Sequence, residues 1–209
     1  MTAVQYDGPI TIAVGQSRRS TQWQNRDLMW SQLVNRLEIP ERTQESAKEY
    51  KALPKAQRDE IKDVGGFVGG VLKGGRRKAD AITQRRLLTL DLDEVPADAD
   101  PWDTVVLVLG CAAVLYSTHS HRPDAPRLRL VMPLSRAVSP EEYAAVARKI
   151  AQDIGSLWYL TFSLPYNDAK NEYCQPFNYV RYNGGELYRI MPVDAEIAET
   201  GLLTYQCEH

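Results

Sequence analysis

One short stretch constrains the fold of this 209-residue chain more than any other: residues 87–93 read LLTLDLD. An apolar run of this length, rich in alternation, predicts a buried β-strand. Side chains two positions apart on a strand share a face, so Asp91 and Asp93 are expected to leave the strand end together. Paired carboxylates suit a hard divalent cation such as Mg²⁺ or Mn²⁺, although aspartates are also ordinary turn residues after a strand.

A second apolar segment, residues 111–116, predicts another strand about 25 residues downstream. It runs directly into a polar stretch that contains Ser117, His119 and His121. Imidazole and hydroxyl groups beside a carboxylate pair are typical of phosphate chemistry. Solvated or structurally hydrogen-bonded histidines are the competing interpretation.

A third strand is predicted over residues 127–133, and its alternation places Arg127 and Arg129 on one face. Guanidinium groups bind phosphate bidentately, so two arginines projecting together suit a nucleotide. A solvent-facing strand that carries arginines for solubility is the alternative.

Basic charge also gathers upstream of these strands, although the net charge of the chain is only −2. Residues 63–78 contain three Gly-Gly pairs, which let the backbone approach a ligand closely. The segment ends in the basic residues Lys73, Arg76, Arg77 and Lys78. It lacks the Gly-Lys-Ser/Thr ending of a Walker A loop, so the choice is between a phosphate or nucleic-acid contact and a solvated hairpin.

Composition excludes several classes. Hydrophobic residues make up 44% and charged residues 25%, as in soluble globular proteins. No apolar run reaches the roughly 20 residues of a membrane span, and the first residues do not resemble a signal peptide, so we expect a cytoplasmic protein with no membrane partner. Three scattered cysteines argue against a disulfide framework and a zinc site.

The remaining pattern predicts a strand over residues 9–15, helices over 25–37 and 139–154, and a hairpin around 183–185. Residues 43–51 and 54–62 are expected to form short polar helices with little chemistry.

These features together resemble the primase-polymerase domains of the archaeo-eukaryotic primase superfamily, in the branch of phage, prophage and virulence-associated-E-like replication proteins. The resemblance covers roughly residues 15–186 and rests on an ordered set of motifs. They are the glycine-rich segment 63–70, the basic loop 73–77, the strand 88–93, the Tyr-Ser-Thr-His run 116–119, and the segments 126–130 and 133–136.

The resemblance implies an α+β, archaeo-eukaryotic primase-type fold, in which a small N-terminal α/β unit packs on an RRM-like antiparallel sheet. We expect a single primase-polymerase domain over residues 1–209. It would comprise the N-terminal unit with the glycine-rich basic loop (1–85), the catalytic unit (86–190) and an acidic tail (191–209).

The resemblance also implies a template-directed nucleotidyltransferase, a DNA primase or polymerase that makes or extends primers by two-metal catalysis. Mg²⁺ or Mn²⁺ would be held by Asp91, Asp93 and a third carboxylate, for which Asp168 is the best candidate by position and Asp153 a weaker one. The phosphates of the incoming nucleotide would contact His119, with His121 as the alternative register, together with Ser117, Arg127 and Arg129.

Nucleic-acid contacts are expected from the basic residues 73–78, with Trp23 and Phe67 as candidates for base stacking. The implied partners are an NTP or dNTP, a single-stranded DNA template with its primer, and a helicase domain in the same full-length protein, in a bacterial host that carries the phage or prophage.

Three other interpretations stay open. One is a single-stranded nucleic-acid-binding module of the same fold without turnover. Another is a haloacid-dehalogenase-like phosphatase that uses Asp91 and Asp93. The third is a His-x-His nicking nuclease, if His119 and His121 share a strand face.

Overall fold

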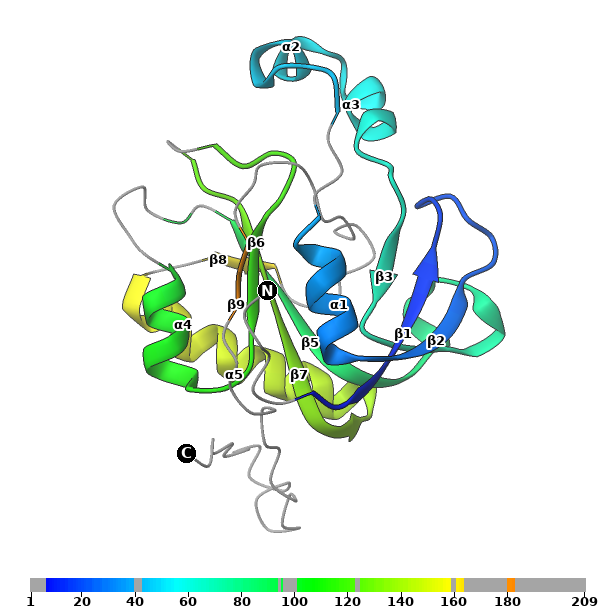
Figure 1. The fold of residues 1–209 in the computed structure, drawn as a ribbon, viewed down its shortest axis with the longest axis vertical. Helices are drawn as coiled ribbons and strands as arrows, with labels where there is room; N and C mark the ends of the chain where they lie inside the picture. The colour runs from blue at the N-terminus through cyan, green and yellow to red at the C-terminus, as the bar shows by residue number, and fades with distance from the viewer. Residues whose placement is uncertain are drawn as a thin grey trace.

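The computed structural model describes residues 7–39, 43–93, 95, 101–122, 125–158, 161–163 and 180–182. They form an α+β arrangement of two antiparallel sheets with helices packed against them (Figure 1). No helix within these ranges combines the length and the apolar character that crossing a membrane requires. In chain order the elements are β1 (Pro9–Gly15), β2 (Gln24–Met29), α1 (Trp30–Leu37), α2 (Ala47–Ala52), α3 (Lys55–Ile61), β3 (Gly66–Val68), β4 (Gly70–Leu72), η1 (Lys73–Gly75), η2 (Ala79–Ala81), β5 (Ile82–Asp93), α4 (Pro101–Leu109), β6 (Val114–Ser117), β7 (Leu128–Val138), α5 (Pro140–Trp158), β8 (Thr161–Ser163) and β9 (Val180–Tyr182).

The larger sheet is built around β5, which confirms the predicted strand and extends it back to Ile82. Its strand order is β4-β5-β7-β6-β9, and β8 pairs with β5 on the edge that β4 also occupies. Because β5 and β6 both pair antiparallel with β7, they run in the same direction and end at the same side of the sheet. The topology therefore brings the end of β5, the end of β6 and the start of β7 together.

The edge of β5 between β4 and β8 is closed by a side chain. The Tyr143 hydroxyl of α5 accepts a hydrogen bond from the Thr89 backbone N–H at 3.1 Å and donates to the Thr89 carbonyl at 3.2 Å. Buried backbone groups need such partners, because an unsatisfied one costs about 1–3 kcal/mol. Tyr143 thus supplies hydrogen-bond partners for the backbone of Thr89, two residues before Asp91.

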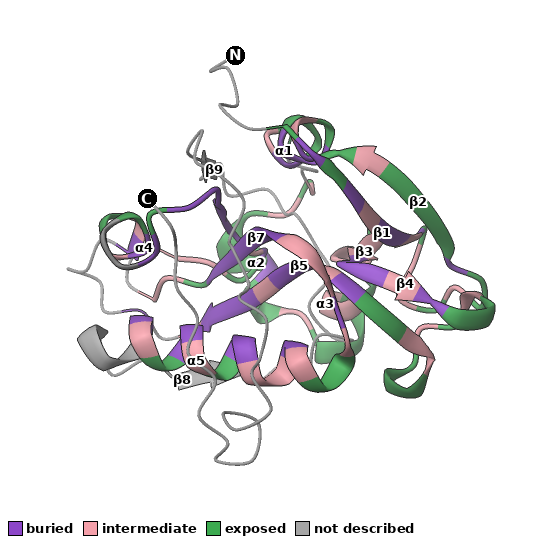
Figure 2. Ribbon diagram, turned by 90° about the horizontal axis from the view of Figure 1, so that it is seen from below, coloured by how far each residue is buried: buried purple, intermediate pink, exposed green. Residues whose placement is uncertain are grey.

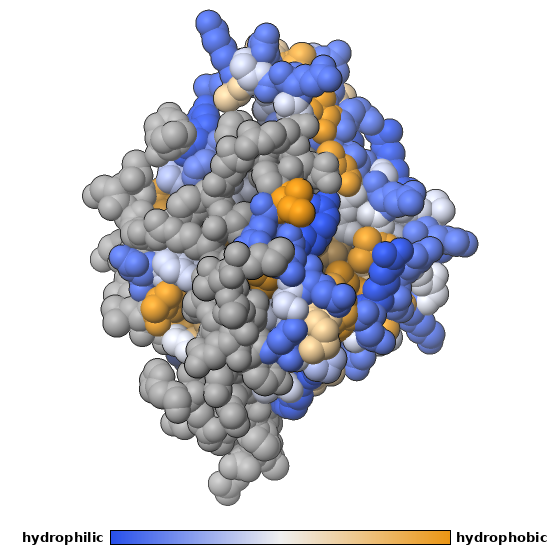
Figure 3. Space-filling model, viewed as in Figure 1, coloured by the Kyte–Doolittle hydropathy of each residue, from blue (hydrophilic) through white to orange (hydrophobic). Residues whose placement is uncertain are grey.

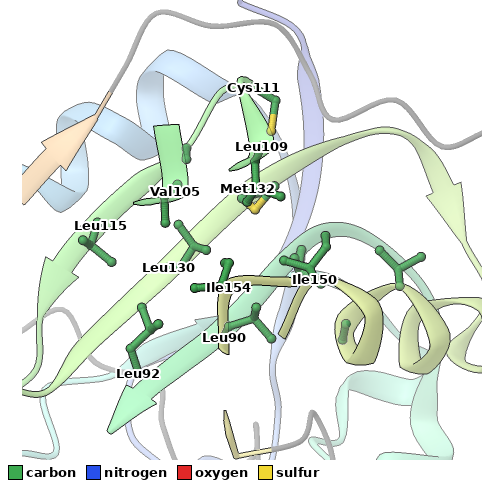
Figure 4. Packing of buried hydrophobic residues seen from close by; sticks show 14 of the residues in the cluster. Leu90, Leu92, Val105, Leu109, Cys111, Leu115, Leu130, Met132, Ile150 and Ile154 are labelled. Atoms are coloured by element: carbon green, nitrogen blue, oxygen red, sulfur yellow. The ribbon is translucent and has the colours of Figure 1, made fainter. Parts of the chain in front are cut away.

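The two faces of the larger sheet are covered differently. Helices α4 and α5 pack on one face, and Figure 2 shows α5 running along it. Alternate residues of β5 point to this side, and Figure 4 shows Leu90 and Leu92 packed among side chains of β6, β7, α4 and α5. The other face packs on β1 and α1 through a second apolar cluster that includes Leu87. Asp91 and Asp93 alternate with the leucines, so they belong to this second face, beyond the region that β1 and α1 cover.

The smaller sheet has the order β2-β1-β3 and confirms the predicted first strand as β1. The predicted helix over 25–37 is wrong in its first part, because residues 24–29 form β2 and pair antiparallel with β1. This segment is mostly exposed, and its pairing with β1 decided its structure over the apparently helical spacing of its apolar residues. The helix proper, α1, buries Trp30, Leu33, Val34 and Leu37.

The glycine-rich segment joins the two sheets. Its first half, β3, pairs with β1, and its second half, β4, pairs with β5. Gly70 permits the close approach, because a Cβ atom there would lie 2.1 Å from the Gln84 carbonyl oxygen. The predicted boundary between residues 85 and 86 falls inside β5, so the two units share a strand instead of dividing there.

Other predictions have mixed outcomes. The helix expected over 139–154 is observed as α5, and the short helices expected over 43–51 and 54–62 are observed as α2 and α3. Helix α4 was not predicted, because its apolar residues show little amphipathic period. The hairpin at 183–185 and the acidic tail lie outside the described residues. The primase-type assignment of the fold stays a prediction.

Candidate functional site

The candidate site lies where β5 and β6 end and β7 begins. Asp91 of β5 is directly opposite Arg129 of β7, and Arg129 is directly opposite Tyr116 of β6. One position further along, Arg127 approaches Asp93, and its carbonyl accepts a hydrogen bond from the Thr118 N–H. Sequence reasoning predicted each of these strand ends separately, and the antiparallel topology brings them together.

Asp91 and Arg129 form a buried ion pair. The Arg129 Nε donates to Asp91 Oδ1 at 2.7 Å, and the two side chains are 5% and 7% exposed. Burial alone would lower the pKa of Arg129, but Asp91 and Tyr116 outweigh it and hold that pKa above its ordinary value. The guanidinium therefore stays charged and neutralises Asp91 inside the protein.

Asp93 lies in a more open place. Its side chain is 34% exposed, and its Oδ1 is 3.7 Å from Nη1 of Arg127, whose side chain is 45% exposed. A contact of this length between half-exposed groups is weak, since exposed ion pairs contribute about 0–1 kcal/mol. Asp93 is the carboxylate of the pair that a ligand from solvent can reach.

The donor chemistry fits a divalent cation only in part. Asp91 and Asp93 offer oxygen donors on one sheet face, as a hard cation prefers. The described part of the chain holds no group of three or more His, Cys, Asp or Glu side chains that could hold a metal ion. Asp168, the predicted third ligand, lies outside the described residues. Asp153 does not replace it, because it is paired with Lys149 on α5, which covers the opposite face.

His119 lies just beyond the end of β6 and is buried. Its ring meets Tyr50 of α2 in an edge-on contact with the ring centroids 4.0 Å apart, and its Nε2 is 3.3 Å from the Thr43 hydroxyl. His121 is in the following turn, where its Nδ1 accepts the Arg127 N–H at 3.2 Å. The two histidines therefore lie in a turn, which does not favour a nuclease that presents both from one strand.

The pKa of His119 lies below the ordinary histidine value, because the side chain is buried and Lys62 acts in the same direction. Burial also lowers the pKa of His121. Both side chains are therefore neutral near pH 7, and a ligand in this place would meet hydrogen-bonding groups, not cations.

This shift predicts a loss of stability in mild acid. The unfolded chain takes up its histidine proton at a higher pH than the folded chain, so stability is complete above about pH 6.5 and falls as the pH drops below it. We expect the thermal midpoint to fall between about pH 7.5 and pH 5, and His119→Gln to make that fall smaller. Thermal unfolding across this range measures it, with His121→Gln as the comparison. Identical pH dependence of stability in wild type and His119→Gln would contradict the lowered pKa of His119.

A cavity of about 420 Å³ opens beside these groups. One wall comes from the turn after β6 and the start of β7, with His119, His121, Arg122 and Arg127. The other wall comes from residues 43–62, which contain α2 and α3 and which we call the helical arm; it stands over this end of the sheet in Figure 1. Four lining residues are Lys or Arg and one, Glu45, is an acid. The cavity is therefore suited to an anionic ligand of nucleotide size.

Sequence analysis missed the helical arm, since its two helices were expected to carry little chemistry. Lys51, Arg58 and Tyr50 of the arm line the cavity. The only signal in the sequence was a set of polar residues on helices too short to show a strong periodic pattern.

Several predicted contacts lie elsewhere. Ser117 is buried opposite Leu128 and does not line the cavity. The basic loop with Lys73, Arg76, Arg77 and Lys78 follows β4, whose last residue pairs with Ile82 at the other end of β5. At about 3.3 Å per residue, it is about 30 Å from Asp91. The loop is thus too far away to bind the same phosphate groups as Arg127.

Of the two predicted stacking residues, Trp23 is buried and Phe67 is only partly exposed. Trp23 is 3% exposed, lies under the Arg77 guanidinium, and fills the space that a Cβ atom on Gly15 would occupy. Phe67 is partly buried against the apolar cluster of β1 and α1. The phosphatase alternative is not favoured either, because the described strands around Asp91 pair antiparallel, whereas doubly wound α/β enzymes use parallel sheets.

Comparisons with known proteins give one match. A family model described as the VapE N-terminal domain matches residues 1–161 of this chain. No curated protein and no solved structure matches it significantly. The matched region includes the aspartates of β5, both histidines, the cavity and the helical arm, and it ends before Asp168.

Proposed function

This chain belongs to the VapE N-terminal domain family, consistent with VapE-like replication proteins of phages and prophages, and from that premise we propose that it is a template-directed nucleotidyltransferase. In this proposal it makes or extends primers on single-stranded DNA, using NTPs or dNTPs, and works beside a helicase domain of the full-length protein.

The observation that carries the proposal is the position of Asp93 beside the cationic cavity. Asp91 and Asp93 share one face of β5, and Arg127 both approaches Asp93 and lines the cavity. A nucleotidyl transfer needs carboxylates at the reacting phosphate and cations along the rest of the phosphate chain. These two requirements meet at the end of β5.

In the proposed reaction, the primer 3′-hydroxyl attacks the α-phosphate of the incoming nucleotide. The new P–O bond extends the primer, the bond to the β-phosphate breaks, and pyrophosphate leaves while the hydroxyl proton passes to solvent. Arg127 and neutral His119 would hold the triphosphate, and Arg129 would keep Asp91 in place. A divalent cation held by Asp93, Asp91 and, as we propose, Asp168 would acidify the attacking hydroxyl and offset the charge on pyrophosphate.

The basic loop keeps its predicted role in nucleic-acid binding in this proposal. Its distance of about 30 Å from Asp91 matches roughly nine base-paired nucleotides at 3.4 Å each. Lys73, Arg76, Arg77 and Lys78 would therefore contact the backbone of the template and primer instead of the incoming nucleotide.

A second candidate is a nucleic-acid-binding module of the same fold without turnover. It is favoured by the ion pair of Asp91, because Arg129 already occupies the oxygen Oδ1 of a carboxylate that a catalytic metal would need.

An incorporation assay run in parallel with single-stranded DNA binding separates the two candidates. We expect wild-type protein with Mg²⁺ or Mn²⁺ to make product on a single-stranded template, and Asp93→Asn, which leaves the buried pair of Asp91 and Arg129 intact, to make almost none while still binding DNA. Lanes without primer decide between priming and extension. A protein that binds DNA but makes no product with either cation, with NTPs or dNTPs, is the binding module.

A further inference from the structure

We infer that the helical arm binds the triphosphate chain of the incoming nucleotide through Lys51 and Arg58. This inference rests on the proposed function, since it takes the cavity as the nucleotide site. It adds two ligand-binding residues and assigns the arm a role in substrate binding.

The arm is fastened to the site by its own side chains. Tyr50 of α2 is buried against the His119 ring, and the Thr43 hydroxyl is within hydrogen-bond distance of that ring. The Tyr50 hydroxyl also donates to the Arg58 carbonyl at 3.3 Å, which ties α3 to α2. These contacts hold the cationic residues of the arm at a fixed place across the cavity from the turn after β6.

The charges of the cavity lie on two facing walls. Lys51 and Arg58 come from the arm, and Arg122 and Arg127 come from the turn after β6 and the start of β7. A triphosphate chain placed between the walls would contact cations on both sides, which suits a polyanion better than a single phosphate group. On the face that Figure 3 presents, hydrophilic side chains predominate over α2 and α3.

The Arg58 guanidinium does not use all of its hydrogen-bond donors within the described part of the chain. Its Nε is buried and has no hydrogen-bond partner among the described residues, and neither Arg58 nor Lys51 pairs with a carboxylate there. Two other cations near α3 are paired, since Arg18 and Lys62 both form ion pairs with Asp59. A guanidinium binds phosphate oxygens with two parallel hydrogen bonds, so an arginine on the cavity wall that is not paired with a carboxylate suits a phosphate ligand.

Equilibrium binding on the full chain tests the inference. The probes are a nucleoside triphosphate in the presence of EDTA, inorganic tripolyphosphate, and a single-stranded oligonucleotide. The variants are Lys51→Gln, Arg58→Gln, their combination, and Arg58→Lys. Lys48→Gln and Lys55→Gln are matched controls, since these exposed lysines lie on the same two helices but do not line the cavity.

We expect each single substitution to weaken binding of both phosphate compounds about tenfold, since a charge-assisted contact to phosphate is lost. The combined variant should lose more, Arg58→Lys should keep part of the affinity, and the controls should stay within about twofold of wild type. Oligonucleotide binding should not change.

Unchanged triphosphate affinity in the combined variant would overturn the inference, as would a wild-type protein that binds neither phosphate compound. A loss confined to the oligonucleotide would overturn it too, because the arm would then bind the strand. The proposed function is tested separately. If the protein binds the triphosphate through these residues but makes no product, the inference about the arm stands and the proposed transferase activity is wrong.

Discussion

Replacing Asp91 with alanine is expected to lower the free energy of unfolding by about 3–5 kcal/mol, a large part of the stability of a domain. The reason is the Arg129 guanidinium, which is 5% exposed and would be left as an uncompensated charge inside the sheet. Urea unfolding followed by circular dichroism measures the change. Any loss of activity in Asp91→Ala must therefore be separated from loss of fold.

A double-mutant cycle measures the interaction energy between Asp91 and Arg129. Asp91→Leu combined with Arg129→Met removes both charges and should cost far less than the sum of the single substitutions, because neither charge is left alone. Asp93→Asn is the matched comparison two residues away, and its half-exposed side chain predicts little change in stability. If the double variant lost as much free energy of unfolding as the two single variants together, the ion pair would not couple these residues.

The largest expected effect on activity comes from Asp93→Asn. We expect nucleotide incorporation to fall by roughly 1,000-fold, since losing a carboxylate that stabilises charge at the reacting phosphate costs several kcal/mol of the activation barrier. The fold should survive, because Asp93 lies in an open place and its contact with Arg127 is weak. The rate of primer extension at saturating nucleotide measures the effect.

Asp103→Asn serves as its control. Asp103 is an exposed aspartate of α4, on the other side of the larger sheet from the site, so the same chemical change there should leave the rate within about twofold of wild type. An Asp93→Asn variant that is folded and as active as Asp103→Asn would remove Asp93 from the reaction.

The parts of the fold that follow from side-chain alternation could be predicted. Leu88, Leu90 and Leu92 are buried against α4 and α5, and this left Asp91 and Asp93 on the opposite face. Arg129 was predicted to share a face with Arg127, but its position beside Asp91 depends on strand pairing, which a single sequence does not reveal.

The other parts of the fold and of the site depend on contacts between segments that are distant in the sequence. Residues 24–29 form a strand because β1 offers them a pairing edge, and this pairing overrode a pattern read as helical. The helical arm reaches the site through Tyr50 and His119, which are far apart in the sequence. Ser117 and Trp23 are both buried, which their places in the sequence did not indicate.

The most direct test of the central claim, that the end of β5 transfers nucleotides, is pyrophosphate release measured together with product length on a single-stranded template. Wild-type protein should release one pyrophosphate for each nucleotide that it incorporates, and Asp93→Asn should lose both signals while Asp103→Asn keeps them. Absence of both signals from wild-type protein with either cation, or equal signals from wild type and Asp93→Asn, would contradict the claim.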